Sequence, residues 1–118
     1  MKAKLKRLHS PDVDLPNYWP EDTRCFGFLL QFFVGPENED GDDSFSITVC
    51  TPRWLEREKS DGMFFGANHL IVSEYDLASI EAFLKRYCER CSGETWPELA
   101  MKIGRIALWE FEDYRPNG

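Results

Sequence analysis

The chain has 118 residues, of which 42% are hydrophobic and 14% are aromatic, and this apolar content suffices for one packed core. Its 14 basic and 21 acidic residues give a net charge of −7, which disfavours nucleic acid and anionic membranes as partners. No apolar stretch has the length of a membrane span or of a secretory signal. We therefore expect a single domain, residues 1–118, in the cytoplasm, with a basic protein as its best electrostatic match.

Two strands and a long loop are expected in the first third of the chain. Residues 2–9 alternate roughly between apolar and basic side chains, which favours a strand at the edge of a sheet. Residues 10–22 contain three prolines and several aspartates, so they predict a loop. Residues 24–34 are nearly continuous in apolar side chains, which is typical of a central strand covered on both faces.

A hairpin, a short helix and a further strand follow. The polar turn at residues 37–43 leads into residues 44–50, whose alternation places Phe, Ile and Val inward and Ser and Thr outward. Residues 52–59 predict a short helix because proline suits the first helical turn. Residues 63–73 predict another strand, with a bulge at Gly66.

The most regular helix is expected at residues 76–91. Apolar side chains recur there at spacings of three and four, and Asp76 suits the N-cap. Gly93 is expected to supply a left-handed cap after the helix ends.

A second helix and a closing strand complete the pattern. Thr95 and Glu98 have the spacing of a capping box, which predicts a helix over residues 96–104. Residues 109–114 alternate between aromatic and acidic side chains, which favours a strand. This order of elements predicts an α+β fold: a mainly antiparallel sheet of four to five strands, with two helices from the C-terminal half packed on one face.

The residues that most often carry chemistry have simpler explanations here. Cys88 and Cys91 resemble half of a zinc site or a redox pair, but both fall on the apolar stripe of a helix, so core packing is favoured. His9 and His69 lie inside predicted strands, which favours structural or surface roles. The common motifs of enzymes and of nucleic-acid binding are absent from the sequence. We expect no catalytic residues, no metal ligands and no cofactor.

Acidic side chains and large aromatics are the remaining candidates for a binding site. Carboxylates steer a cationic partner and raise its association rate, while aromatic side chains anchor it. The simpler explanation for the acidic turn is a solvated loop that keeps the protein soluble. The candidate partner-binding residues are Asp12, Asp14, Trp19, Glu37, Glu39, Asp40, Asp42, Asp43, Trp54, Glu110, Glu112 and Asp113.

Six short motifs run in order along nearly the whole chain: Leu8-His-Ser-Pro-Asp12, Asn17-Tyr-Trp-Pro-Glu-Asp22, Phe26-Gly-Phe-Leu-Leu-Gln31, Val49-Cys-Thr-Pro-Arg-Trp-Leu55, Gly93-Glu-Thr-Trp96 and Trp109-Glu-Phe-Glu-Asp-Tyr114. Together they resemble the immunity protein 8 family of bacterial polymorphic toxin systems. The resemblance implies a cytoplasmic protein that binds the C-terminal domain of a cognate toxin and blocks it without catalysis. The family brings no catalytic or binding residues with it.

Two alternatives stay open at the level of sequence. One is a small enzyme that uses Glu and Asp as acid and base, with His69, in a cleft between sheet and helices. The other is an acidic adaptor that forms homo-oligomers through an exposed sheet edge.

Overall fold

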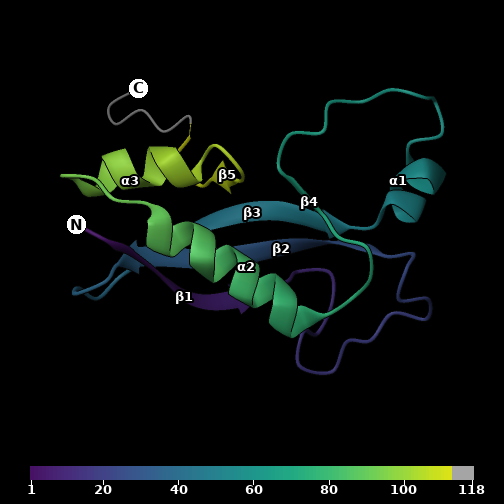
Figure 1. Cartoon of the computed structure of the whole chain (residues 1–118), viewed down its shortest axis with the longest axis horizontal. Helices are drawn as coiled ribbons and strands as arrows, with labels where there is room; N and C mark the ends of the chain where they lie inside the picture. The colour runs from purple at the N-terminus through teal and green to yellow at the C-terminus, as the bar shows by residue number, and fades with distance from the viewer. Residues whose placement is uncertain (113–118) are drawn as a thin grey trace.

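Residues 1–112 are described by the structure, which is a computed structural model (Figure 1). They form a five-stranded sheet of β1 (Ala3–His9), β2 (Gly27–Pro36), β3 (Asp43–Cys50), β4 (His69–Ile71) and β5 (Leu108–Trp109). Three helices accompany it: α1 (Pro52–Glu58), α2 (Leu77–Arg90) and α3 (Trp96–Ile103). The predicted α+β class is confirmed. Within this part of the chain, every helix falls short of the length and apolarity that a membrane crossing requires.

The β2–β3 hairpin forms the centre of the sheet. β2 pairs antiparallel with β3 from Gly27 opposite Cys50 to Val34 opposite Asp43. Because side chains alternate along a strand, one face of the hairpin is apolar and fully buried. α2 lies across this face near β1, and α3 lies near β5 (Figure 1). The side chains buried there are Phe28, Leu30, Phe32, Val34, Phe45, Ile47 and Val49.

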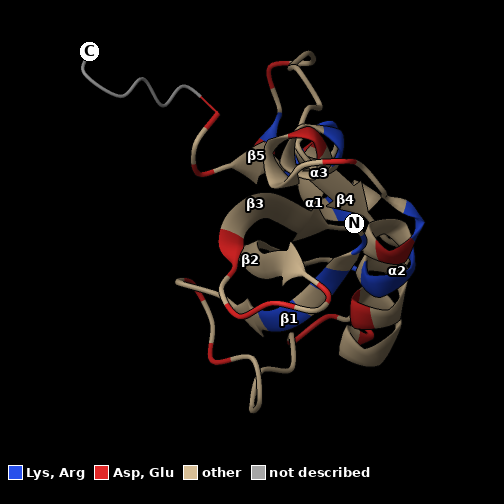
Figure 2. Cartoon of the chain, turned by 90° about the vertical axis from the view of Figure 1, so that its left-hand side faces the viewer, with Lys and Arg blue, Asp and Glu red and all other residues tan. Residues whose placement is uncertain are grey.

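The opposite face of β2 corrects one expectation, because it is only half-buried. Leu29, Gln31 and Phe33 lie on this face, whereas α2 and α3 lie on the other side of the sheet (Figure 2). The guanidinium of Arg7 on β1 stacks over the ring of Phe33 at 3.6 Å. The side chain of Arg7 therefore covers apolar surface for which the sequence predicted a second layer of secondary structure.

β4 is much shorter than the strand predicted over residues 63–73. It pairs parallel with Thr48–Cys50 of β3, while β5 pairs antiparallel with Phe45 and Ser46 on the same edge. Since the two strands share one edge, neither can extend toward the other, which limits β4 at its N-terminal end. Residues 63–67 instead form an exposed loop, and Asn68 leaves it with a φ of 59°.

The helix caps confirm one prediction and correct another. Asp76 caps α2 by accepting a hydrogen bond from the Ser79 amide. Gly93 does not adopt the left-handed conformation, because α2 ends at Cys91 in extended backbone. The chain then runs straight into a bridge between Ser92 and Lys2, which leaves no reversal for a glycine to make.

The start of α3 follows the predicted capping box only in part. The Thr95 hydroxyl accepts a hydrogen bond from the Glu98 amide at 3.4 Å, as predicted. The Glu98 carboxylate accepts from the amide of Glu94, one residue before the expected donor. The helix still begins at Trp96, because the threonine satisfies a free amide of its first turn.

The closing strand is present at Trp109 but is shorter than predicted. β5 spans only Leu108–Trp109, and the amide of Glu112 then donates to the carbonyl of Trp109, which turns the chain. Residues 113 and 114 of the predicted strand lie outside the described residues.

Cys88 and Cys91 belong to the hydrophobic core, as their helical spacing predicted. Both are buried, with exposed fractions of 0% and 8%. Burial raises the pKa of the Cys88 thiol to about 12. Neither position is therefore a reactive thiolate at neutral pH.

A single carboxylate connects the end of the chain to the hairpin. The Oδ2 atom of Asp43 accepts hydrogen bonds from the indole Nε1 of Trp96, at 2.7 Å, and of Trp109, at 2.9 Å. These donors come from the first residue of α3 and from β5. Asp43 therefore holds both elements against the start of β3.

Replacing Asp43 should destabilise the fold because two half-buried indole N–H groups would lose a charged acceptor. We expect Asp43→Ala to lower the free energy of unfolding by about 2–3 kcal/mol, and Asp43→Asn by less. Urea denaturation followed by tryptophan fluorescence measures the change. Asp40→Ala, an exposed acid in the same turn, is the matched control and should change it by less than about 0.5 kcal/mol. Equal effects of the two alanine variants would contradict this role for Asp43.

Candidate functional site

The candidate binding residues lie at two ends of the sheet, and the structure does not bring them into one surface. β2 has 10 residues, so its ends are about 30 Å apart. The acidic turn follows the end of β2 near the start of β3 (Figure 1). Asp12, Asp14, Trp19 and Trp54 lie beyond the other end of the hairpin, in the loop before β2 and on α1.

Basic side chains of β1 partly neutralise the acidic turn. The Lys6 ammonium donates to the backbone carbonyls of Glu39 and Gly41, and Arg7 lies 3.9 Å from the carboxylate of Asp42. Figure 2 shows the basic residues of β1 and α2 on the same side of the molecule as this turn. The turn therefore carries mixed charge near its base and exposed acids at its tip.

Some candidate acids at this end hold the backbone in place. Glu110 accepts a hydrogen bond from the Ser44 amide at 2.8 Å, and Asp43 holds the two indoles described above. Glu112 is exposed, with its carboxylate near Gly104. Asp113 lies outside the described residues. The exposed acids that the turn itself offers to a partner are Glu37, Glu39 and Asp40.

At the other end, side chains anchor the loop before β2. Backbone pairing between β1 and β2 stops at His9 and Gln31. Beyond it, the Ser10 hydroxyl donates to the Leu29 carbonyl at 2.7 Å, and Asp12 accepts from the Leu29 amide at 2.8 Å. These two side chains continue the ladder, which fixes the path of the loop toward Trp19.

Asp14 and Trp54 also have structural contacts. Asp14 accepts from the side-chain amide of Asn17 at 2.8 Å, and this bond closes a turn inside the loop. The indole of Trp54 lies directly on Gly27, where a Cβ atom would overlap it. Only glycine at position 27 allows the helix to pack this closely on the start of β2.

Trp19 is the most exposed of the aromatic candidates, with 69% of its surface accessible. Its ring meets the ring of Tyr75 edge-on at 5.5 Å, and Tyr18 meets the same ring at 5.3 Å. Tyr75 is only 5% exposed and also contacts Phe26. The exposed indole therefore packs against a buried aromatic cluster.

Trp19 borders an open depression of about 440 Å³, which we call the Trp19 depression. The loop before β2 forms one wall, and α1 forms the other. Arg53 and Asp22 form an exposed ion pair at its edge, with 3.5 Å between nitrogen and oxygen. Its aromatic side chains and charges of both signs suit protein recognition. The lining residues used below are Trp19, Glu21, Asp22, Cys25, Trp54 and Arg57.

The phenol of Tyr75, whose ring contacts Trp19, is an unfavourable buried polar group. Its oxygen is buried and has no hydrogen-bond partner among the residues that the structure describes. Burial raises the pKa of this phenol, and the nearby Tyr18 adds to the effect. A buried hydroxyl without a partner costs about 1–3 kcal/mol, and each such group in a folded protein calls for an explanation.

The histidine of the enzyme alternative has a different role. The His69 Nδ1 atom donates hydrogen bonds to the carbonyls of Ala67, at 2.7 Å, and Gly66, at 3.2 Å, so this ring holds the loop before β4 in place. His9 is exposed on β1. In residues 1–112, no group of three or more His, Cys, Asp or Glu side chains is arranged to hold a metal ion.

A model of the family described as immunity protein 8 matches residues 3–114. The chain belongs to the immunity protein 8 family. The resemblance drawn from the six motifs is thereby confirmed, and membership implies an immunity protein that acts against polymorphic toxins. No curated protein and no solved structure gives a significant match to the chain.

Sequence analysis of this immunity protein 8 chain missed Tyr75, although a local signal was present. Tyr75 directly precedes the N-cap Asp76, and Ile80 is the fourth residue of α2. Apolar residues at these two positions form a hydrophobic staple, and both are buried here. The pattern would have placed Tyr75 in the core, but not below Trp19, which is 56 positions away in the sequence.

The cysteines should differ in reactivity, which makes one of them a probe of the depression. Burial raises the pKa values of Cys50, Cys88 and Cys91, whereas Cys25 is half-buried and lines the depression. At pH 8 a thiol with a pKa of about 12 is ionised to about one part in ten thousand. We expect iodoacetamide to modify Cys25 at least tenfold faster than Cys88, as measured by peptide mass spectrometry. Denaturant should abolish the difference, and similar rates in the native protein would contradict the burial described here.

Proposed function

We propose that this immunity protein 8 chain neutralises its cognate toxin by binding the toxin's C-terminal domain, without catalysis, in the cytoplasm. The Trp19 depression is the anchor of the interface. The observation that carries this proposal is the 69% exposed indole of Trp19, held edge-on against the buried Tyr75. Family membership over residues 3–114 supports the class of partner.

A supported tryptophan suits binding because it buries a large apolar area at a small entropic cost. Its edge-on contact with Tyr75 limits the movement of the ring before the partner arrives. Tryptophan is among the residues that most often dominate binding energy, particularly where surrounding contacts exclude water. The rim charges of Glu21, Asp22 and Arg57 can supply those contacts around the ring.

Net charge has a separate role in this proposal. A net charge of −7 attracts a basic domain at long range and raises the rate of encounter. A toxin that acts on nucleic acid would present such a basic surface. The exposed acids of the turn contribute to this field without needing to touch the partner.

Truncation of Trp19 should weaken the complex strongly. With the C-terminal domain encoded by the open reading frame immediately upstream as the binding partner, we expect Trp19→Ala to raise the Kd at least 30-fold, or about 2 kcal/mol. Isothermal titration calorimetry at two salt concentrations measures the affinity. Leu108→Ala on β5, where the side chain is 51% exposed, is the control and should change the Kd less than threefold. Equal Kd values for wild type and Trp19→Ala would place the anchor elsewhere.

The acidic turn should affect how fast the complex forms. Neutralising Glu39 and Asp40 together, as Glu39→Gln and Asp40→Asn, should lower the association rate several-fold at low salt and leave the dissociation rate unchanged. Stopped-flow fluorescence in 20 mM and 500 mM salt provides the measurement. A slower association that persists at high salt, or a faster dissociation, would show that the turn contacts the toxin directly.

A further inference from the structure

β4 forms an open edge of the sheet. The Thr48 amide donates to the Asn68 carbonyl at 2.9 Å, and the Val72 amide donates to the Cys50 carbonyl at 2.8 Å. In a parallel pair this pattern turns the backbone groups of Leu70 toward β3 and those of His69 and Ile71 away from it. Within the described part of the chain, no strand pairs with this outer edge. Such an edge can accept another strand.

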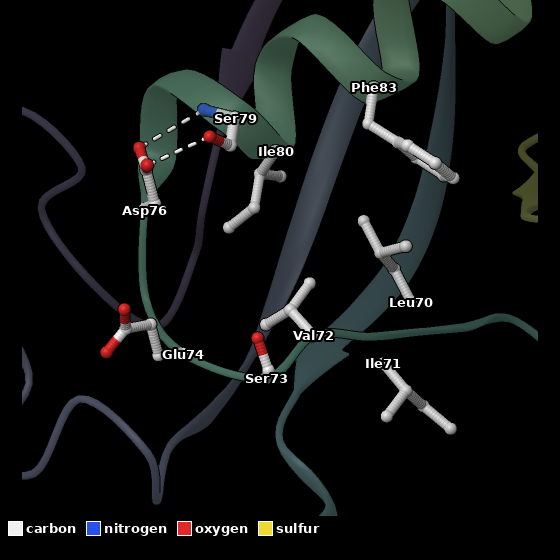
Figure 3. A pocket seen from close by; sticks show the side chains of 9 residues that line it. All are labelled: Leu70, Ile71, Val72, Ser73, Glu74, Asp76, Ser79, Ile80 and Phe83. Carbon is white, nitrogen blue, oxygen red and sulfur yellow. Dashed lines mark hydrogen bonds between the residues drawn. The ribbon is translucent and has the colours of Figure 1, made fainter.

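An apolar groove of about 410 Å³ lies between this edge and α2. Figure 3 shows Leu70 and Val72 pointing toward Ile80 and Phe83 of α2, whereas Ile71 points the other way. Phe83 and Ile71 are each 54% exposed. An added strand would therefore find apolar surface on both sides of its pleat, since its side chains alternate as those of β4 do.

One end of the groove is acidic. Glu74 and Asp76 line it, and the Glu74 carboxylate is 4.0 Å from Arg24 across an exposed ion pair. Hydrogen bonds from the Ser79 hydroxyl and amide hold the pKa of Asp76 below its usual value, so this carboxylate is charged at neutral pH. A lysine or arginine on the bound segment would be favoured at this end.

The groove also adjoins the Trp19 depression. Tyr75 lies between Glu74 and Asp76 in the sequence, and its ring contacts Trp19. A standard interface covers about 800 Å² on each partner, which is more than a depression around one indole provides. A toxin domain seated on Trp19 could continue past Tyr75 into the groove and reach that area.

We propose that the β4–α2 groove receives an extended segment of the toxin domain as an added strand on β4, with apolar side chains over Phe83 and Ile80 and a basic side chain at Glu74. This inference rests on the proposed function, because the occupant is the toxin itself. A second copy of the chain fits less well: it would bring another charge of −7 to the same surface.

Two variants test the groove through different atoms. Ile71→Pro removes the outward N–H and leaves the inward groups of Leu70 and Val72 free to pair with β3. Phe83→Ala removes the exposed ring on α2. We expect each to raise the Kd for the upstream-encoded toxin domain at least tenfold.

Two further variants are the controls. Ile71→Ala keeps the N–H and should weaken binding less than Ile71→Pro. Met101→Ala on α3, where the side chain is 67% exposed, should change the Kd less than threefold.

Hydrogen exchange on the wild-type protein keeps the test independent of folding defects in the variants. The amides of His69 and Ile71 should exchange rapidly in the free protein and at least tenfold more slowly in the complex. Tight binding without this protection, and without an effect of Phe83→Ala, would overturn the groove and leave the proposed function standing. No binding of the toxin domain to wild type would overturn both. A dimer of the free protein that Ile71→Pro dissociates would overturn the toxin as occupant in favour of a second copy.

Discussion

The antiparallel pairing of β2 with β3 limits where every other described element can lie. It creates one face that is almost entirely apolar, and removing this face from water requires a cover of helices. β1 occupies the free edge of β2, and the free edge of β3 is divided between β4 and β5. Because that second edge is shared, β4 cannot extend toward β5, and the chain before it forms an exposed loop.

Acidic side chains in this protein have two roles: some accept hydrogen bonds within the fold, and others face solvent. Asp12, Asp43 and Glu110 accept hydrogen bonds from amides or indoles at points where regular pairing stops. Charged acceptors suit these positions because their hydrogen bonds are stronger than neutral ones. Their charge still contributes to the field around the molecule, but their oxygens are engaged within the fold. Composition alone therefore overstates how many carboxylates are available to a partner.

In the proposed interface, the residues that attract the toxin at long range lie far from the residues that anchor it. The exposed acids of the turn lie about 30 Å from the Trp19 depression, by the length of β2. Long-range attraction tolerates this separation, whereas short-range contacts do not. Trp19 contacts Tyr75, which lies in the short segment between β4 and α2 and therefore stays near the edge of β4. An aromatic cluster beside an open strand edge offers a partner both side-chain and backbone contacts.

Local pattern in the sequence determined most of the elements and the family. Alternation identified the strands of the hairpin, helical spacing identified α2 with its buried cysteines, and Asp76 and Thr95 marked the starts of two helices. These features depend on neighbours within a few residues, which a sequence displays directly. The same logic failed at residues 63–68 and at the C-terminal strand, where length depends on a distant partner.

Tertiary structure alone decided the composition of the candidate site. Asp43 and Trp109 are 66 positions apart, and only the sheet brings the carboxylate to the indole. Trp19 meets Tyr75 because a loop before β2 and a loop before α2 converge beside the same strand. The arrangement of the elements decides which surfaces are covered. It leaves the indole of Trp19 exposed and the edge of β4 open, and it divides the acids into those bonded within the fold and those that face solvent. A sequence specifies which side chains prefer burial, but the pairing of distant segments decides which of them obtain it.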